Sequence, residues 1–296
     1  MLEGSAVRGE IVSLDLSWQQ IAQRQQGLPE TVVQTLGELC AAAVLLGATI
    51  KFDGSIILQI HGDGPIALVV VEYQHDGSLR ATVKMREGQI APPGACLQSL
   101  VNSGGRGRFA VTLDPRIRSD SRQPWQGIVP FEGDSVAAVL ERYMQRSEQV
   151  PTRLWLAADG GRAAGMLLQQ LPSEGGRPSA PDDPDAWNRM QHLADTLTEG
   201  ELLQHSSADI LNRLFWQERM HGYEPRGLRF GCSCSRAKVA GMLRMLGAAE
   251  VEEILAERGE VEVRCDFCNQ PYEFDAVDCA ALFQPNLSGD TPLARH

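Results

Sequence analysis

The first 172 residues change their hydrophobic period several times, which predicts a mixture of strands and helices. Residues 28–50 carry apolar side chains at helical spacing behind Pro29, a residue that suits a helix start. Short β-rich runs follow, and Asp76-Gly77 between two of them is a strong hairpin signal. We expect strands at residues 7–14, 55–60, 66–73, 79–85, 108–113, 126–130, 153–157 and 164–171.

A second helix is expected over residues 135–144, because its apolar residues follow helical spacing from Val136 to Tyr143. Asp134 precedes it and is the expected N-cap. Helices inserted among antiparallel strands are typical of an α+β fold. We therefore expect an N-terminal α+β domain with an antiparallel sheet over residues 1–175.

The composition changes over residues 171–185, where Pro, Gly, Ser and Asp dominate, and this favours a boundary. Helical patterns then cover residues 186–197, 199–205 and 208–217. These segments are short and have no core of their own, so they must pack on a neighbouring domain to stay folded. We expect residues 176–228 to form a metastable helical linker that can be switched.

Four of the seven cysteines form two close pairs near the C-terminal end. Cys232 and Cys234 are separated by one residue, Cys265 and Cys268 by two, and thirty residues lie between the pairs. The insert predicts two helices and a strand at 260–264, and residues 272–274 would pair back as a hairpin. Two short-range pairs of thiolates satisfy tetrahedral zinc, so residues 229–289 are expected to form a small module that binds one zinc ion; His221 is a weaker substitute ligand.

A site of four thiolates is coordinatively closed, so it has no position for water or substrate, and we do not expect an enzyme. Two interpretations remain, a structural zinc ribbon that serves nucleic acid or a protein partner, and a thiol switch held by the metal. The net charge of the chain is −11, and residues 229–296 hold 7 basic and 11 acidic residues. A nucleic-acid ribbon should be basic there, which favours the switch.

Composition places the chain among ordinary globular proteins, with 43% hydrophobic and 22% charged residues. The N-terminus has the pattern of a strand and not of a secretory signal. The longest apolar stretch, residues 40–50, is too short for a bilayer span and predicts a buried helix. We expect a cytoplasmic protein with no membrane and no nucleic-acid partner.

Oxidation offers a way to operate such a switch, because oxidants attack thiolates and each pair is close enough for a local disulfide. Structural zinc supplies roughly 10–16 kcal/mol, comparable to the roughly 5–15 kcal/mol that stabilises a whole protein. Loss of the metal should unfold a module of this size, and the linker would then expose its apolar face. Such a surface binds unfolded polypeptides.

The cysteine motifs and their neighbours closely resemble the bacterial redox-regulated heat-shock chaperone family HslO, the 33 kDa chaperonins. The likeness covers nearly the whole chain. It is carried by Leu228-Arg-Phe-Gly-Cys-Ser-Cys-Ser-Arg236, Phe267-Cys-Asn-Gln-Pro-Tyr272, Val7-Arg-Gly9, Gly62-Asp-Gly-Pro65, Gln126-Gly-Ile-Val-Pro130, Glu132-Gly-Asp-Ser135 and Ser147-Glu-Gln-Val-Pro-Thr-Arg153.

The resemblance implies an ATP-independent holdase that is zinc-bound and inactive when reduced. It further implies that oxidation under unfolding stress pairs Cys232 with Cys234 and Cys265 with Cys268, releases zinc, unfolds the linker and promotes homodimerisation. Clients, which are unfolded proteins, would then pass to ATP-dependent foldases. Cys40, Cys96 and Cys279 lie outside the motif, and we expect them to be buried small hydrophobic residues.

Three further features are expected to be structural. Gly104-Gly-Arg-Gly107 lacks the Lys-Ser/Thr of a phosphate loop and predicts a glycine turn. His61 and His75 stand beside turn glycines and should face solvent. Glu132 and Asp134 have the spacing of a carboxylate pair, but the expected role of Asp134 as a cap argues against catalysis.

Overall fold

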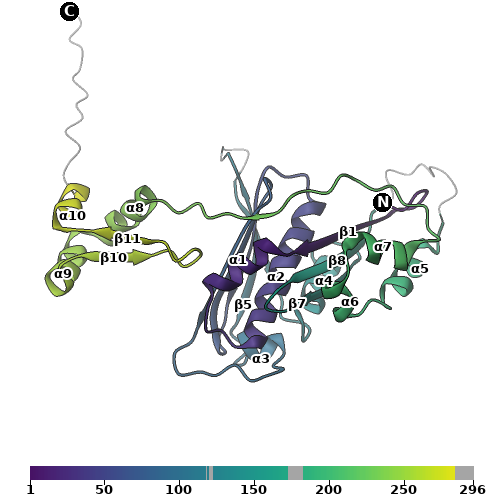
Figure 1. Cartoon of the computed structure of the whole chain (residues 1–296), viewed down its shortest axis with the longest axis horizontal. Coiled ribbons are helices and arrows are strands. Elements are labelled where there is room, and N and C mark those ends of the chain that lie inside the picture. The colour runs from purple at the N-terminus through teal and green to yellow at the C-terminus, as the bar shows by residue number, and fades with distance from the viewer. Residues whose placement is uncertain (118, 120–122, 173–182, 284–296) are drawn as a thin grey trace, which may run out of the picture. The chain divides into compact units, whose positions relative to one another are not determined.

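The computed structural model describes residues 1–117, 119, 123–172 and 183–283. The chain divides into two compact units, Met1–Gly231 and Cys232–His296 (Figure 1). The expected domain boundary at 175 and the expected module end at 289 lie outside the described residues. The helices expected in the linker belong to the first compact unit.

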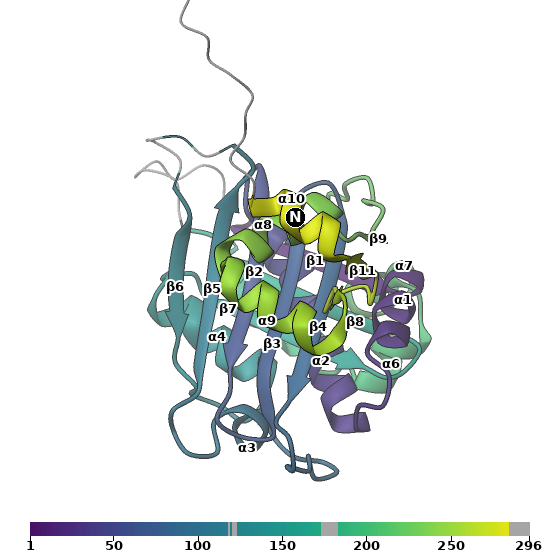
Figure 2. The same ribbon diagram turned by 90° about the vertical axis from the view of Figure 1, so that its left-hand side faces the viewer.

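A six-stranded sheet forms one layer of the first unit, and its strands lie in the order β6-β5-β2-β3-β4-β9 (Figure 2). All neighbouring strands are antiparallel except β9, which runs parallel to β4. Alternate side chains of the central strands are buried, as the sequence pattern predicts. The strands are β2 (Gly54–His61), β3 (Ile66–Gln74), β4 (Ser78–Met85), β5 (Arg108–Pro115), β6 (Trp125–Val129) and β9 (Arg229–Phe230).

A separate antiparallel sheet has the order β1-β8-β7. Its strands are β1 (Val7–Leu14), β7 (Thr152–Ala158) and β8 (Ala163–Gln170). Every strand expected from the sequence is therefore confirmed, with ends shifted by a few residues.

Helix α2 (Glu30–Thr49) packs against strands of both sheets, and its side chains form much of the main core. The helix approaches β3 so closely at Gly47 that a Cβ there would come within 2.6 Å of the Tyr73 ring, which explains why this position is a glycine. Among the described residues this is the one helix long and apolar enough to cross a membrane, but 72% of its apolar window is buried. The expectation of a buried core helix is confirmed.

The other helices of this domain include two that the sequence pattern did not predict. These are α1 (Leu16–Arg24) and α3 (Leu97–Val101), whereas α4 (Val136–Arg146) was expected. Asp134 is not the N-cap of α4, so that prediction was wrong. The cap is Ser135, whose extended backbone lets its Oγ accept a hydrogen bond from the Ala138 N–H, while the Asp134 carbonyl accepts from Leu97.

Helices α5 (Ala186–Ala194), α6 (Glu199–Gln204) and α7 (Ser207–Phe215) pack on the three-stranded sheet. Phe215 and Met190 are buried with Met166 and Leu168 of β8, and Leu202 is buried with β7 and β8 residues. The expectation that these short helices have no separate core is confirmed, because their buried faces complete clusters that belong to the sheet.

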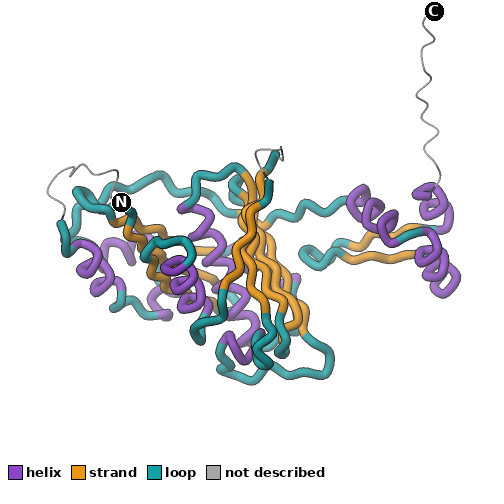
Figure 3. The backbone as a smooth tube through the Cα atoms, turned by 180° about the vertical axis from the view of Figure 1, so that it is seen from behind, coloured by secondary structure: helices purple, strands orange, loops and turns teal. Residues whose placement is uncertain are grey.

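The chain from Trp216 to Leu228 contains neither helix nor strand apart from an isolated bridge between Met220 and Leu2 (Figure 3). Few backbone hydrogen bonds fix it. The Glu3 N–H donates to the Arg219 carbonyl, and His221 exchanges hydrogen bonds with Met1. Side chains also hold the segment, since Glu218 pairs with Arg189 of α5 and Leu228 packs against the main core.

The second unit contains α8 (Arg236–Leu246), α9 (Ala248–Arg258), the hairpin of β10 (Val261–Arg264) and β11 (Pro271–Phe274), and α10 (Ala276–Phe283). Both helices of the insert and the hairpin were expected, whereas α10 was not. Six buried side chains form the core among its described residues. They are Ala240, Leu243, Val251, Val261, Phe274 and Cys279.

Candidate metal and thiol centre

Two short loops carry the four cysteines of the second unit. Cys232 and Cys234 follow β9 and precede Ser235, whose side chain accepts the Lys238 N–H and begins α8. Cys265 and Cys268 lie in the turn between β10 and β11. The Cys265 N–H donates to the Gln270 carbonyl, and the Cys265 carbonyl accepts a hydrogen bond from the Asn269 N–H. Asn269 has a positive φ of 59°, which closes the turn.

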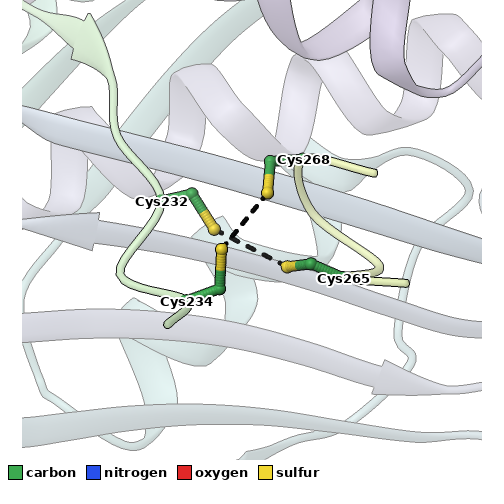
Figure 4. Close-up of side chains that lie close together, drawn as sticks. All are labelled: Cys232, Cys234, Cys265 and Cys268. Carbon is green, nitrogen blue, oxygen red and sulfur yellow. Dashed lines mark hydrogen bonds between the residues drawn. The ribbon is translucent and has the colours of Figure 1, made fainter. Parts of the chain in front are cut away.

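The four sulfur atoms point toward one centre (Figure 4). All of them lie within 4.8 Å of one another, with Cys232 Sγ 3.7 Å from Cys265 Sγ and Cys234 Sγ 3.3 Å from Cys268 Sγ. A tetrahedral zinc ion with Zn–S bonds of about 2.3 Å separates its sulfurs by about 3.8 Å, whereas a disulfide needs about 2.05 Å. All four cysteines are free thiols in positions that can hold a metal ion.

The loops are held by contacts that join α8 to the hairpin and to α10. Arg236, two residues after Cys234, donates to the Glu273 carbonyl, pairs with Asp278 at 2.5 Å, and stacks over the Phe274 ring at 4.1 Å. One side chain at the start of α8 therefore fixes the first cysteine loop against β11 and α10. The small core adds to this support.

The thiols polarise one another. Burial opposes ionisation of Cys232, but hydrogen bonds from the Cys234 backbone and from the surrounding thiols prevail and lower its pKa to about 7. Burial raises the pKa of Cys265 and of Cys268, and the hydrogen bonds that link the Cys268 thiol to the other three thiols add to the rise at Cys268. A cluster that readily accommodates one thiolate has the chemistry of a cation site.

Tyr272 is a contact that spacing did not predict. Its hydroxyl donates to Cys234 Sγ at 3.1 Å from β11, where it pairs with Val263 in the hairpin register. This hydrogen bond to the sulfur raises the pKa of Tyr272 to about 12. The sequence predicted the strand but offered no signal for the hydroxyl, because the contact depends on the register of β10 against β11.

The remaining candidates behave as structural residues, with one exception. Cys40 and Cys279 are buried, as expected, but Cys96 is exposed and its Sγ lies 3.5 Å from Ser99 Oγ, so that prediction was wrong. Cys96 directly precedes α3, a helix that the pattern did not predict, which places it at the surface. Among the described residues, the metal-ligating group contains the four cysteines and not His221.

The other sequence motifs also have structural explanations. The loop at residues 104–107 is a turn whose Gly104 and Arg106 N–H groups donate to the Asp63 carboxylate, which lowers the pKa of that group. His61 and His75 are exposed, as expected. Glu132 pairs with Arg142 and Arg146 of α4.

Comparison with known proteins identifies the chain. A family model described as Hsp33 protein matches residues 1–275. The chain belongs to the Hsp33 family. It is 48% identical over 288 residues to the 33 kDa chaperonin of Methylobacillus flagellatus, covering 97% of this chain and 94% of the relative. It is 46% identical over 296 residues to the 33 kDa chaperonin of Chromobacterium violaceum, covering 100% and 96%.

The fold also agrees with that of a solved Hsp33 structure. The crystal structure of the 33 kDa chaperonin from Thermotoga maritima matches with a TM-score of 0.75 at 22% identity, covering 94% of this chain and 93% of that chain. The α+β architecture and the family resemblance are thereby confirmed. As a member of the Hsp33 family this protein is a chaperone, and the family assignment implies that it is not an enzyme.

Proposed function

We propose that this chaperone is a redox-regulated, ATP-independent holdase whose sensor is the cluster of Cys232, Cys234, Cys265 and Cys268. The observation that carries the proposal is the convergence of four free sulfur atoms within 4.8 Å in a unit with a small core. Soft thiolate ligands in tetrahedral array select zinc over magnesium or calcium. In the reduced state these four residues would hold one zinc ion, which would stabilise the fold of the second unit.

Oxidation would remove the ligands. Within each close pair, the two thiolates would lose two electrons to hydrogen peroxide and join in one disulfide bond. The peroxide would take up these two electrons and two protons, its O–O bond would break, and two water molecules would leave. We propose the pairs Cys232 with Cys234 and Cys265 with Cys268. A disulfide sulfur is a poor ligand, so the residues would release the metal, and the unit would lose roughly 10–16 kcal/mol of stabilisation.

Loss of the second unit would release the linker at its C-terminal end. The segment from Trp216 to Leu228 is held by few backbone hydrogen bonds, and α5, α6 and α7 span only nine, six and nine residues. Helices of this length are not stable alone in water. Their detachment would uncover the apolar clusters on β1, β7 and β8 that they now bury.

The exposed apolar surface would bind unfolded client proteins, support a homodimer in the oxidised state, and hand clients over to ATP-dependent foldases. We place the protein in the cytoplasm, where reduced thiols persist. The acidic charge of −11 argues against nucleic-acid partners, and the buried position of α2 argues against a membrane partner.

One experiment tests the switch. Zinc release and suppression of aggregation of a thermally unfolding client should be followed together, with and without peroxide at elevated temperature. We expect zinc to leave and holdase activity to appear in the peroxide sample only. Retention of zinc, or zinc loss without activity, would overturn the redox switch and leave the zinc site with a structural role only.

A further inference from the structure

Strand β9 occupies an edge of the six-stranded sheet in the way that a bound peptide would. The Arg229 N–H donates to the Gly77 carbonyl, and the Gly231 N–H donates to the Leu79 carbonyl, both at 3.0 Å. The pairing is parallel and only two residues long. The segment is received by residues 76–79, which belong to the β3–β4 turn and to β4, and by Arg24 of α1. We call this region the β4 slot.

The segment in the β4 slot has alternating character. Leu228 and Phe230 both pack against the main core, and the Phe230 ring lies under the Arg24 guanidinium at 4.3 Å. Arg229, between them, is exposed. This alternation is that of a strand with one buried face. The slot therefore accommodates two apolar side chains that are two residues apart.

Asp76 binds the side chain of the residue between the two apolar positions. Its carboxylate accepts a hydrogen bond from one terminal nitrogen of Arg229 at 2.6 Å, and its backbone carbonyl accepts from the other at 2.8 Å. The second carboxylate oxygen accepts the Ser78 N–H at 2.9 Å, which holds the carboxylate in place. A forked contact of this kind suits a guanidinium better than the single ammonium of lysine.

A small residue is required at the end of the segment. A Cβ placed on Gly231 would lie 2.9 Å from Ser78 Cβ and 3.0 Å from Ser78 Oγ, and Ser78 is buried. Any larger side chain would force the strand away from β4. The slot therefore fits the pattern apolar, arginine, apolar, glycine.

We infer that the β4 slot is a client-binding site, which takes extended segments of unfolded polypeptide with this pattern as an added strand parallel to β4. The inference rests on the proposed function, because unfolding of the second unit together with detachment of the linker would free residues 228–231 from β4 and empty the slot. The main-chain hydrogen bonds allow client segments of different sequence to bind. Asp76 favours an arginine between the two apolar residues, and Ser78 favours a glycine at the end. In the reduced chain the tethered segment excludes clients, since its effective concentration is in the millimolar range for a short connection.

The slot can be tested without oxidation by a variant that weakens the tethered segment. Arg229→Glu places a carboxylate beside Asp76, so the segment should leave the slot while zinc stays bound. The probe is a fluorescent peptide of sequence Arg-Gly-Leu-Arg-Phe-Gly, identical to residues 226–231, and its binding is followed by anisotropy. Arg219→Glu is the charge-matched control, because Arg219 is exposed in the chain between α7 and β9 and lies outside the slot.

We expect the reduced, zinc-loaded Arg229→Glu chain to bind the peptide and the parent and Arg219→Glu chains not to bind it. Replacing the second arginine of the peptide by lysine should weaken binding roughly two- to fivefold, and glutamate there should weaken it by roughly tenfold or more. Valine in place of the final glycine should abolish it. Zinc content and circular dichroism verify that each variant is folded, and Phe230→Ala serves as a second way to empty the slot.

The two hypotheses fail in different ways. If neither Arg229→Glu nor Phe230→Ala binds the peptide, or if the lysine, glutamate and valine peptides bind equally well, the slot inference is overturned even though peroxide still activates the parent. If both variants bind but the peroxide-treated parent does not, the slot stands and the proposed opening by oxidation is wrong. Binding by the variants and by the oxidised parent supports both.

Discussion

The hydroxyl of Tyr272 lies 3.1 Å from Cys234 Sγ and donates a hydrogen bond to it from the strand that follows the second cysteine pair. It is thus an outer partner of the candidate metal centre. Outer partners orient ligands, and their loss commonly lowers metal affinity about 10- to 100-fold.

We therefore expect Tyr272→Phe to lower zinc affinity by about tenfold while the hairpin still folds, because the ring and its packing remain. Competition with a chromophoric chelator measures the affinity. Tyr223→Phe is the matched control, since Tyr223 is 71% exposed and belongs to the other compact unit. Equal affinity in Tyr272→Phe and parent would show that the hydroxyl does not support the site.

Cys265→Ser should lower zinc affinity more severely, by at least about 100-fold, because it removes a ligand and not an outer partner. The second unit should then unfold at a lower temperature, since metal binding and folding are coupled. Zinc content after dialysis and the thermal transition of the unit give the two readouts. Cys96→Ser, at an exposed cysteine outside the cluster, should leave both unchanged.

Phe215→Ala should loosen the linker without any oxidant. The side chain is 2% exposed in the cluster that joins α7 to the three-stranded sheet, and truncation of a buried phenylalanine costs about 3–5 kcal/mol. Hydrogen exchange in α5 to α7 should accelerate, and the reduced chain should suppress aggregation in part. The neighbouring Trp216→Ala, at 74% exposure, should change stability by less than about 0.5 kcal/mol.

If Phe215→Ala detaches the linker but the reduced chain remains inactive, the surface beneath α5 to α7 is not the client surface. If exchange in these helices is unchanged, the helices do not depend on the cluster that buries them. Either result is specific to one step of the proposed function.

Glu38 should make the first unit less stable as the pH rises. Burial within the fold raises the pKa of this carboxyl from 4.5 to about 7, and Glu199 on α6 acts in the same direction. The folded state therefore retains a proton that the unfolded state loses, so stability falls between about pH 4.5 and pH 7 and is constant above. The loss is of the order of 1–3 kcal/mol.

Glu38→Gln should remove this decline and stabilise the unit at pH 8, which urea unfolding at pH 5 and pH 8 would reveal. Glu30→Gln, at an exposed carboxylate of the same helix, should leave the decline in place. An unchanged slope in Glu38→Gln would show that another group is responsible.

Local patterns predicted most of the first unit, because its strands and central helix bury one regular face each. The failures are informative. Strand β9 has two residues and exists because β4 offers an edge, so no periodicity within Arg229–Phe230 could have predicted it. The cap of α4 was assigned one residue early, since Asp134 and Ser135 are both good caps and the backbone angles decided between them.

The cysteine cluster was predictable because metal chemistry restricts ligand type and spacing within a few residues. Its surroundings were not, since Tyr272 and Arg236 reach the site through hairpin register and helix packing. The exposure of Cys96 was also missed, because the short helix α3 that follows it carries no strong sequence signal.

The pairing of β1 with β8 has a consequence for synthesis on the ribosome. The two strands join Leu14 to Ala163 and Val7 to Gln170, so β1 waits for a partner roughly 150 residues later. At about 5–20 residues per second, translation of that interval takes on the order of 10–30 s. Met1 waits longer still, because it bonds to His221. During synthesis, β1 of this chaperone therefore stays unpaired until β8 has been made. We expect the nascent chain to depend on the cell's other chaperones during that interval.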